Sequence, residues 1–270
     1  MLDQSKQVPV ALAALQDCLA DCLCAVYLYG SAVSGGLRPQ SDIDLLAMVD
    51  RRMTQRERAN LLSSLLKLSG RHPPKPGGLR CLEVTVFTRP DLAAGLFPAR
   101  AEFIFGEWLR DAFEAGETPM SAQSAEFTLV LAQAQQEAIT LFGQDRDRLL
   151  PVIPVTDVRH AMRELLPELL GGIREDTRNV LLTLARIWHT AENGTFVSKD
   201  EGASWAMPRL SDRSALTLSY ARRAYLGEVR DNWNNLQDRM ECLAEELTSK
   251  INQAMSSYGP LPEIPTKQDS

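Results

Sequence analysis

The chain has 270 residues, of which 44% are hydrophobic and 24% are charged, as in a folded globular protein of one large or two modest domains. Its net charge of -6 argues against a general nucleic-acid binder, because contacts to a phosphate backbone need a basic surface. No apolar run is long enough to cross a membrane, and residues 1–8 lack the features of a signal peptide. We therefore expect a cytoplasmic protein whose 5 cysteines are buried free thiols.

A glycine-serine turn follows the first predicted strand. Apolar residues at helical spacing predict a helix over residues 9–23, and the apolar run at 24–29 predicts a strand. Gly30-Ser31 ends that strand, and we expect a short helix between it and Gly35-Gly36. Such a turn offers accessible backbone N–H groups and a hydroxyl, which is the chemistry of phosphate binding.

Two carboxylates lie inside the next predicted strand, residues 42–49. Strand side chains alternate between two faces, so Asp42 and Asp44 point the same way. Their repulsion costs stability unless a cation lies between them, and Mg²⁺ suits such a pair because it prefers oxygen ligands and substrate phosphates. A solvated turn or a helix cap is the more common role of an Asp-x-Asp pair. The upstream glycine-serine turn and the flanking apolar runs favour metal binding here.

A third carboxylate lies in a further predicted strand, residues 79–87, after an expected helix at 54–68 with the N-cap Thr54. Glu83 alternates with Leu82, Val84 and Val86. An exposed edge strand is one explanation for this glutamate. The other is that it completes a metal site and acts as a general base. The Pro- and Gly-rich loop between helix and strand holds His72, which we interpret as a solvated imidazole.

Aromatic residues gather in residues 102–110. Phe103 and Phe105 fit an ordinary apolar core. Trp108, beside Glu107, is a candidate wall for an amphipathic ligand, with core packing as the alternative.

From residue 121 onward the sequence has helical periodicity. The predicted helices are residues 126–141, 157–170, 176–190, 198–207, 211–226 and 232–251. Glycine and prolines within residues 142–155 indicate a boundary. The expected fold is α+β: a mixed sheet with helices at residues 1–153, an all-helical bundle domain at 154–258, and an extended or disordered tail at 259–270.

Gly-Ser followed about ten residues later by Asp-x-Asp resembles the signature of the nucleotidyltransferase superfamily. The chain as a whole is similar to the aminoglycoside nucleotidyltransferases, above all to the adenylyltransferases that modify spectinomycin and, in many members, streptomycin. The matching blocks are residues 28–46, 82–86, 105–110, 180–188, Ser198-Lys199-Asp200 and 225–227.

The resemblance implies a nucleotidyltransferase domain before the bundle, and it implies a role for each matching residue. Asp42, Asp44 and Glu83 would hold the metal, with Glu83 as the catalytic base. The expected contacts to the nucleotide come from Ser31, Ser41, Glu126 (an Asp in relatives), Arg186, Lys199 and Tyr225. The expected contacts to the drug come from Trp108 and Asp176, with Glu107 added because its charge would offset the drug's ammonium groups.

Several of these residues have an ordinary structural alternative. Lys199 is also compatible with a solvated surface position, and Asp176 with a simple helix cap. Tyr225 is compatible with packing near a helix end, and Arg186 with an ion pair to a carboxylate.

The expected function is Mg²⁺-dependent transfer of AMP from ATP to the 9-hydroxyl of spectinomycin by a monomer. Relatives that also accept streptomycin carry a Trp and an Asp shortly before the position of Asp176, and residues 166–175 contain neither. Four alternatives stay open: a dual streptomycin 3''/spectinomycin 9 enzyme, a superfamily enzyme that adenylylates another small molecule or a protein, a binding-only protein, and a polymerase-like enzyme. The complete set of carboxylates disfavours the third, and the acidic balance disfavours the fourth.

Overall fold

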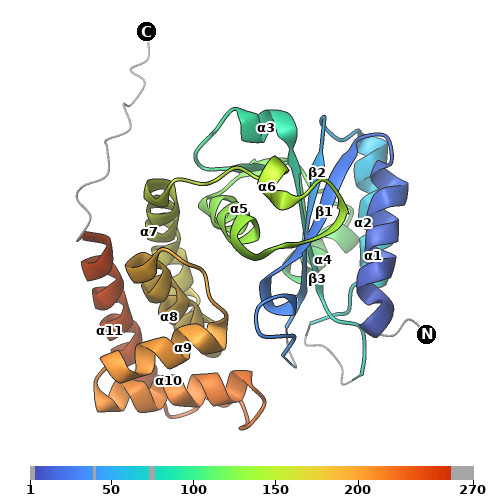
Figure 1. Ribbon diagram of the computed structural model, residues 1–270. Coiled ribbons are helices and arrows are strands. Elements are labelled where there is room, and N and C mark those ends of the chain that lie inside the picture. The colour runs from blue at the N-terminus through green and yellow to red at the C-terminus, as the bar shows by residue number, and fades with distance from the viewer. Residues whose placement is uncertain (1–3, 39–40, 73–76, 257–270) are drawn as a thin grey trace.

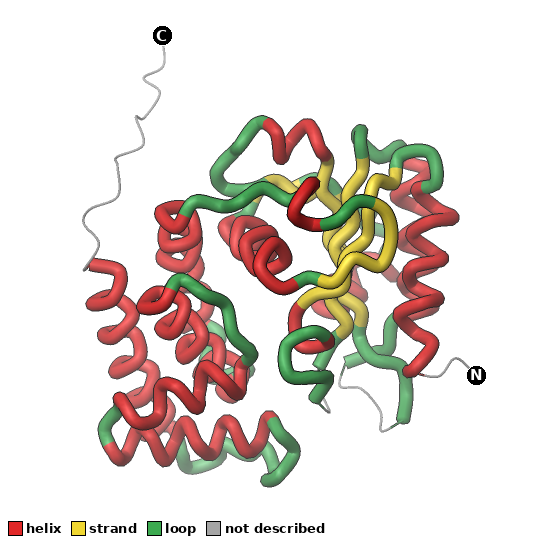
Figure 2. The backbone as a smooth tube through the Cα atoms, viewed as in Figure 1, coloured by secondary structure: helices red, strands yellow, loops and turns green. Residues whose placement is uncertain are grey.

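The computed structural model describes residues 4–38, 41–72 and 77–256 (Figure 1). The predicted tail at 259–270 and residues 73–76 of the predicted loop lie outside this range. Strands gather in the N-terminal half, whereas the C-terminal half consists of helices joined by loops (Figure 2). Among the described residues, no helix is long and apolar enough to span a membrane.

A mixed sheet forms the centre of the N-terminal half. Its strand order is β5-β3-β2-β1-β7. The strands are β1 (Leu23–Tyr29), β2 (Ile43–Val49), β3 (Leu82–Thr88), β5 (Phe103–Phe105) and β7 (Ile139–Gly143). β2 and β3 run parallel, and the other neighbouring pairs run antiparallel. Since β3 lies between β2 and β5, the edge-strand explanation for Glu83 is wrong.

Two helices cover one face of this sheet, α1 (Gln4–Leu19) and α2 (Gln55–Leu68) (Figure 1). The predicted N-cap is confirmed, because Thr54 and Glu57 form a capping box at the start of α2. Alternate residues of β2 and β3, such as Leu45 and Val84, pack into this helix-covered core. The remaining side chains of β2 and β3 therefore point to the opposite face.

The helix α5 (Ala125–Glu137) covers the opposite face, where Phe127 and Leu131 pack against Tyr27, Met48 and Phe87. By strand alternation, the carboxylates of Asp44 and Glu83 lie on this same face.

The predicted helix at 126–141 is wrong at its end. Ala138 is extended, with φ -64° and ψ 147°, and β7 begins at Ile139. Pairing with β1 determines the conformation of these apolar residues, whose spacing fits helix and strand equally well.

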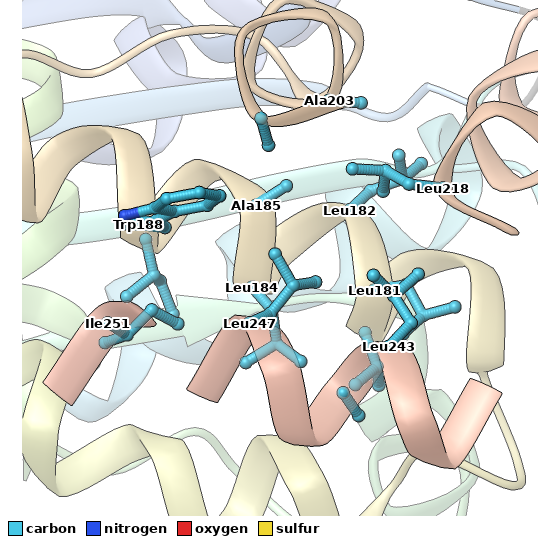
Figure 3. Close-up of a cluster of buried hydrophobic side chains, with 14 of the residues drawn as sticks. Leu181, Leu182, Leu184, Ala185, Trp188, Ala203, Leu218, Leu243, Leu247 and Ile251 are labelled. Carbon is cyan, nitrogen blue, oxygen red and sulfur yellow. The ribbon is translucent and has the colours of Figure 1, made fainter. Parts of the chain in front are cut away.

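The C-terminal half is a bundle around α8 (Thr177–Asn193). Its other helices are α7 (Val155–Gly171), α9 (Lys199–Ala206), α10 (Asp212–Tyr225) and α11 (Gln237–Ser256). Leu184 and Trp188 of α8 are buried together with Leu247 and Ile251 of α11 (Figure 3). The predicted helix at 232–251 starts late, because the side chain of Asn232 accepts from the backbone N–H of Asn234 and favours a turn there.

Shorter elements complete the described chain. They are the 3₁₀ turns η1 (Gly30–Ala32), η2 (Glu107–Leu109) and η3 (Met207–Arg209), the helices α3 (Arg89–Ala93), α4 (Arg110–Glu114) and α6 (Arg146–Leu149), and the two-stranded sheet of β4 (Arg100–Ala101) and β6 (Ala122–Gln123). All five cysteines are free thiols, but the expectation that they are buried is met by Cys22 and Cys81 alone, and Cys242 is exposed. The boundary between residues 153 and 154 stays a prediction, because α5 packs against α7 across it.

Candidate active site

A cavity of about 560 Å³ lies between the carboxylate face of the sheet, α5 and the helices α7 to α9. Asp42, Asp44 and Glu83 form part of its wall. The wall also contains every residue expected to contact the nucleotide: Ser31, Ser41, Glu126, Arg186, Lys199 and Tyr225. Residues more than 180 positions apart in the chain thus meet in one cavity.

Strand register brings the carboxylates together. Asp44 and Glu83 are direct partners on the parallel strands β2 and β3, and Asp42 stands one residue before β2. Gly30, the first residue of η1 after β1, packs against Asp44 with φ +68°, and a Cβ added to it would lie 2.1 Å from Asp44 Oδ2. Both the positive φ and the close approach require glycine at this position.

Each of these carboxyl groups resists ionisation. Burial and the neighbouring Asp42 raise the pKa of Asp44 to about 7. Burial, then Asp44 and Asp42, raise the pKa of Glu83 well above the usual range. Burial also raises the pKa of Asp42, and a hydrogen bond to Glu83 and the charge of Lys199 oppose that rise. A cation placed among the three groups would remove this repulsion.

The carboxylates in this cavity suit Mg²⁺, which takes few protein ligands, better than they suit a metal that is bound by protein ligands alone. In the described part of the chain, no three acidic, His or Cys side chains already enclose a common metal position. Mg²⁺ is usually bound through one or two carboxylates, with water and substrate phosphates completing its octahedron. Asp42 and Asp44 supply such a pair, and the cavity leaves room for phosphates beside them.

Two cationic side chains from the bundle face the carboxylates. Burial lowers the pKa of both Lys199 and Arg186. Lys199 is the first residue of α9, where a capping box between Ser198 and Glu201 fixes the helix start. Its Nζ lies 6.0 Å from the centre of the Tyr225 ring.

Lys199 therefore lies in the cavity wall, and the surface-lysine alternative is wrong. Arg186 Nη2 donates to Oε1 of Gln133 at 3.3 Å. This bond joins it to an amide of α5, and no ion pair to Arg186 is found among the described residues.

Two acidic side chains tie the glycine-serine turn and the loop after it to distant segments, and the sequence did not predict either pairing. Glu137 of α5 accepts from the backbone N–H of Gly30 at 3.0 Å and from the hydroxyl of Ser34. Arg38 forms an ion pair with Asp200 of α9, 2.8 Å between Nη2 and Oδ2. Glu137 stands in no recognisable motif, and although Arg38 and Asp200 lie in blocks that match the family, nothing in the sequence pairs them, so only the folded chain reveals these contacts.

Two family models match the sequence. Residues 148–250 match the aminoglycoside adenylyltransferase C-terminal domain, and residues 20–76 match the polymerase beta nucleotidyltransferase model. A spectinomycin 9-adenylyltransferase of Staphylococcus aureus is 39% identical over 242 residues, which cover 90% of this chain and 93% of the relative. The chain belongs to the aminoglycoside adenylyltransferase family.

Further relatives of this adenylyltransferase match over nearly the whole chain. An aminoglycoside (3'') (9) adenylyltransferase of Escherichia coli is 34% identical over 257 residues, 93% of this chain and 96% of the relative. The crystal structure of spectinomycin adenyltransferase AAD(9) from Enterococcus faecialis with ATP and spectinomycin superimposes with a TM-score of 0.85. The two sequences are 28% identical, and the superposition covers 91% of this chain and 100% of the chain in the crystal structure. The predicted α+β fold and the predicted enzyme class are confirmed.

The residues predicted to contact the drug are not among those that line the cavity of this adenylyltransferase. Glu107 is paired with Arg110, 2.7 Å between Oε2 and Nε, and accepts from the hydroxyl of Ser69 at 2.6 Å. Its charge is therefore already neutralised within the N-terminal half. Trp108 is 58% exposed, so the core-packing alternative for it is wrong.

Asp176 stands at the N-cap position of α8, and its side chain makes no capping hydrogen bond. It accepts instead from Nδ2 of Asn179 at 2.6 Å. The simple helix-cap alternative therefore does not describe this carboxylate. Asn179 lines the cavity, so Asp176 is connected to the cavity wall through its hydrogen bond with Asn179.

Proposed function

We propose that this enzyme transfers AMP from ATP to the 9-hydroxyl of spectinomycin in a Mg²⁺-dependent reaction. The observation that carries the proposal is a single cavity holding Asp42, Asp44 and Glu83 opposite Lys199 and Arg186. Carboxylates that can share a metal, facing cations that can bind phosphates, are the requirements of nucleotidyl transfer.

The names of the relatives specify the two substrates. Spectinomycin 9-adenylyltransferases of Staphylococcus aureus and Campylobacter jejuni are 39% and 35% identical to this chain, and the superimposed crystal structure contains ATP and spectinomycin.

The nucleotide is assigned to the side of the cavity where the two halves meet. Ser31 and Ser41 would contact its phosphates from the turn and loop between β1 and β2, and Lys199 and Arg186 from the bundle. Glu126 and Tyr225 would lie beside the rest of the nucleotide. Mg²⁺ bound to Asp42 and Asp44 would neutralise charge on the phosphates during transfer.

Glu83 is assigned as the general base. In the metal-free protein, burial and the charges of Asp44 and Asp42 raise its pKa well above the usual range. A cation held by Asp42 and Asp44 would favour the ionised form of Glu83, which can accept a proton from a hydroxyl. As the drug oxygen forms its bond to the α-phosphorus, the bond to pyrophosphate breaks and the hydroxyl proton passes to Glu83. A side-chain hydrogen bond to Asp42 holds the carboxyl group of Glu83 within the site.

Asp176 and Trp108 stay assigned to the drug, because both stand at positions implied by the family resemblance. Glu107 is the weakest of the proposed drug contacts, since Arg110 and Ser69 already use its carboxylate. We expect spectinomycin to be strongly preferred, because residues 166–175 lack the Trp and Asp described above.

A dual streptomycin 3''/spectinomycin 9 activity is the second candidate, and one observation favours it. Glu168 lines the cavity and its charge contributes to the raised pKa of Glu126, whose largest cause is burial. A carboxylate there would attract a guanidinium group of streptomycin. It would not replace an aromatic wall, so we rank this candidate below spectinomycin alone.

The test is incubation of the purified protein with ATP, Mg²⁺ and either spectinomycin or streptomycin. Mass spectrometry should detect spectinomycin carrying one AMP, with an equal amount of pyrophosphate released. Omission of Mg²⁺ should abolish both products. Modified streptomycin in comparable yield would support the dual activity, and no modified drug in either tube would refute the proposal. A monomer in the cytoplasm stays a prediction, which light scattering and cell fractionation would check.

A further inference from the structure

Two consecutive hydrogen bonds between side chains join the proposed nucleotide site to the proposed drug site. Lys199 Nζ donates to Oδ1 of Asn179 at 3.0 Å. Asn179 Nδ2 in turn donates to Oδ2 of Asp176 at 2.6 Å. The cation expected to bind phosphates and the carboxylate expected to bind the drug are therefore linked through one amide.

Asparagine matches both neighbours in this position. An ammonium group can only donate and a carboxylate can only accept, so the residue between them must accept on one side and donate on the other. The two neighbours also fix which way the amide faces. The charges of Lys199 and Asp176 interact as well, since Asp176 works against the effect of burial on the pKa of Lys199.

We propose that the amide of Asn179 couples the two ligand sites, an inference that rests on the proposed function. When Lys199 Nζ moves to the phosphates of a bound nucleotide, Oδ1 of Asn179 loses the donor that fixes the amide. Asn179 is then free to turn away, and Asp176 becomes available to an ammonium group of a cationic ligand. Nucleotide binding should therefore strengthen drug binding, and by linkage the drug should strengthen nucleotide binding by the same factor.

The position of Asn179 supports this role. It stands in the first turn of α8 and in the cavity wall, between the helix start at Asp176 and the first residue of α9. Gly202 allows α9 to lie close to α8, because a Cβ there would already be 3.1 Å from the Cα of Arg186. The close helix packing keeps Lys199 within reach of Asn179.

The experiment is calorimetric titration of spectinomycin into the full-length protein, with and without Mg²⁺ and an ATP analogue that has a methylene bridge between its α and β phosphates. In the wild type, the analogue should lower the Kd of spectinomycin by at least about tenfold, within the usual range of coupling between two sites. In Asn179→Leu, which keeps the branched shape of the side chain but cannot form hydrogen bonds, this ratio should fall to about one. Asn193→Leu, at the exposed far end of the same helix, should keep the wild-type ratio.

A second variant, Asn179→Asp, should change the affinity for the ATP analogue, whereas Asn179→Leu should not. Asn179→Asp offers Lys199 a charged acceptor, so the ammonium group is held more firmly and the Kd of the analogue should rise by about fivefold or more. Asn179→Leu releases Lys199 and should leave the Kd of the analogue close to the wild-type value. A residue with a merely structural role would weaken nucleotide binding in both variants.

Three results would overturn the coupling: a wild-type ratio of one, an unchanged ratio in Asn179→Leu, or equal weakening of the analogue in both Asn179 variants. Failure of the proposed function looks different. In that case the wild-type protein binds the analogue and binds no spectinomycin under either condition, which refutes the proposed function and the coupling together.

Discussion

Asp44 and Glu83 face each other as register partners on two parallel strands, in the interior of the sheet. Parallel partners keep their side chains on the same face at closely spaced backbone positions, so neither carboxylate can move away without moving its strand. The repulsion between the two charges is therefore built into the sheet.

Glu83→Gln should remove the base and keep the shape of the site. We expect the turnover number for spectinomycin to fall by about 10²- to 10⁴-fold, as is usual for loss of a general base. The Kd of ATP should change little, because Asp42, Asp44 and Lys199 remain. The measurements are steady-state kinetics and calorimetry on the same preparation. Turnover at the wild-type rate would show that another group accepts the proton.

The stability of the ligand-free protein should depend on the ionisation of Asp44, whose pKa is raised from 3.8 to about 7. A carboxyl group with a raised folded pKa binds its proton more tightly in the folded state. Its contribution to stability is complete below the unfolded pKa and is lost as the pH rises toward 7. Urea denaturation at pH 5 and pH 8 should therefore show a lower free energy of unfolding at pH 8, and the ionisation of Asp44 should account for part of the difference.

Asp44→Asn provides the control for that pH dependence, because the amide has nearly the same shape and no charge. The decrease in the free energy of unfolding between pH 5 and pH 8 should be smaller in the variant than in the wild type. Mg²⁺ together with the ATP analogue should also reduce the decrease in the wild type, since a bound cation favours the charged carboxylate. An equal decrease in variant and wild type would assign it to other groups.

Gly30→Ala should damage the site through one contact. The new methyl group would lie 2.1 Å from Asp44 Oδ2, so the carboxylate must move and the metal position is lost. We expect adenylylation to fall below detection. Gly36→Ala is the matched control, because Gly36 also has a positive φ of +86° but has no atom within 4 Å of an added Cβ. Both variants carry a backbone cost of about 1 kcal/mol, so equal loss of activity would assign the effect to backbone strain.

The ion pair between Arg38 and Asp200 should matter for nucleotide binding. It ties the loop after the glycine-serine turn to α9, which carries Lys199. Arg38→Met should raise the KM for ATP by roughly tenfold and change the turnover number less, because the phosphates would meet Lys199 in a less defined position. Asp200→Asn should behave in the same way.

The double variant of Arg38 and Asp200 tests whether the pair acts as one unit. Combined in one protein, the two changes should cost about as much as either alone, since each already breaks the pair. Costs that simply add in free energy would mean that the two residues act separately.

The carboxylates were predictable because their positions depend on local rules. Strand alternation places Asp42 and Asp44 on one face, and the turn before them needs glycine. The pattern did not show which strands are neighbours, so Glu83 had two explanations until the strand order excluded an edge position. The same limit explains the error at Ile139, where pairing with β1 overrides a helical spacing.

The bundle's share of the site was predictable through family resemblance alone. Lys199 and Arg186 stand far from the carboxylates in the chain, and no periodicity relates residues on separate helices. Contacts between distant segments were missed altogether, as for Glu137 with Gly30 and for Arg38 with Asp200, because no pattern in the sequence pairs these residues. Asn179 was missed for the same reason, because its role depends on two partners that approach it from different helices.

The helix α5 belongs to both halves of the molecule. Phe127 and Leu131 lie in the core beside the sheet, whereas Leu129 and Ala132 pack against the core of the bundle. A gene fusion that joined the first 153 residues of one relative to the bundle of another would place two unmatched surfaces along this helix. Viable exchange between relatives should therefore transfer α5 together with the bundle side chains that contact it, and surviving hybrids should carry compensating changes at Leu129 or Ala132.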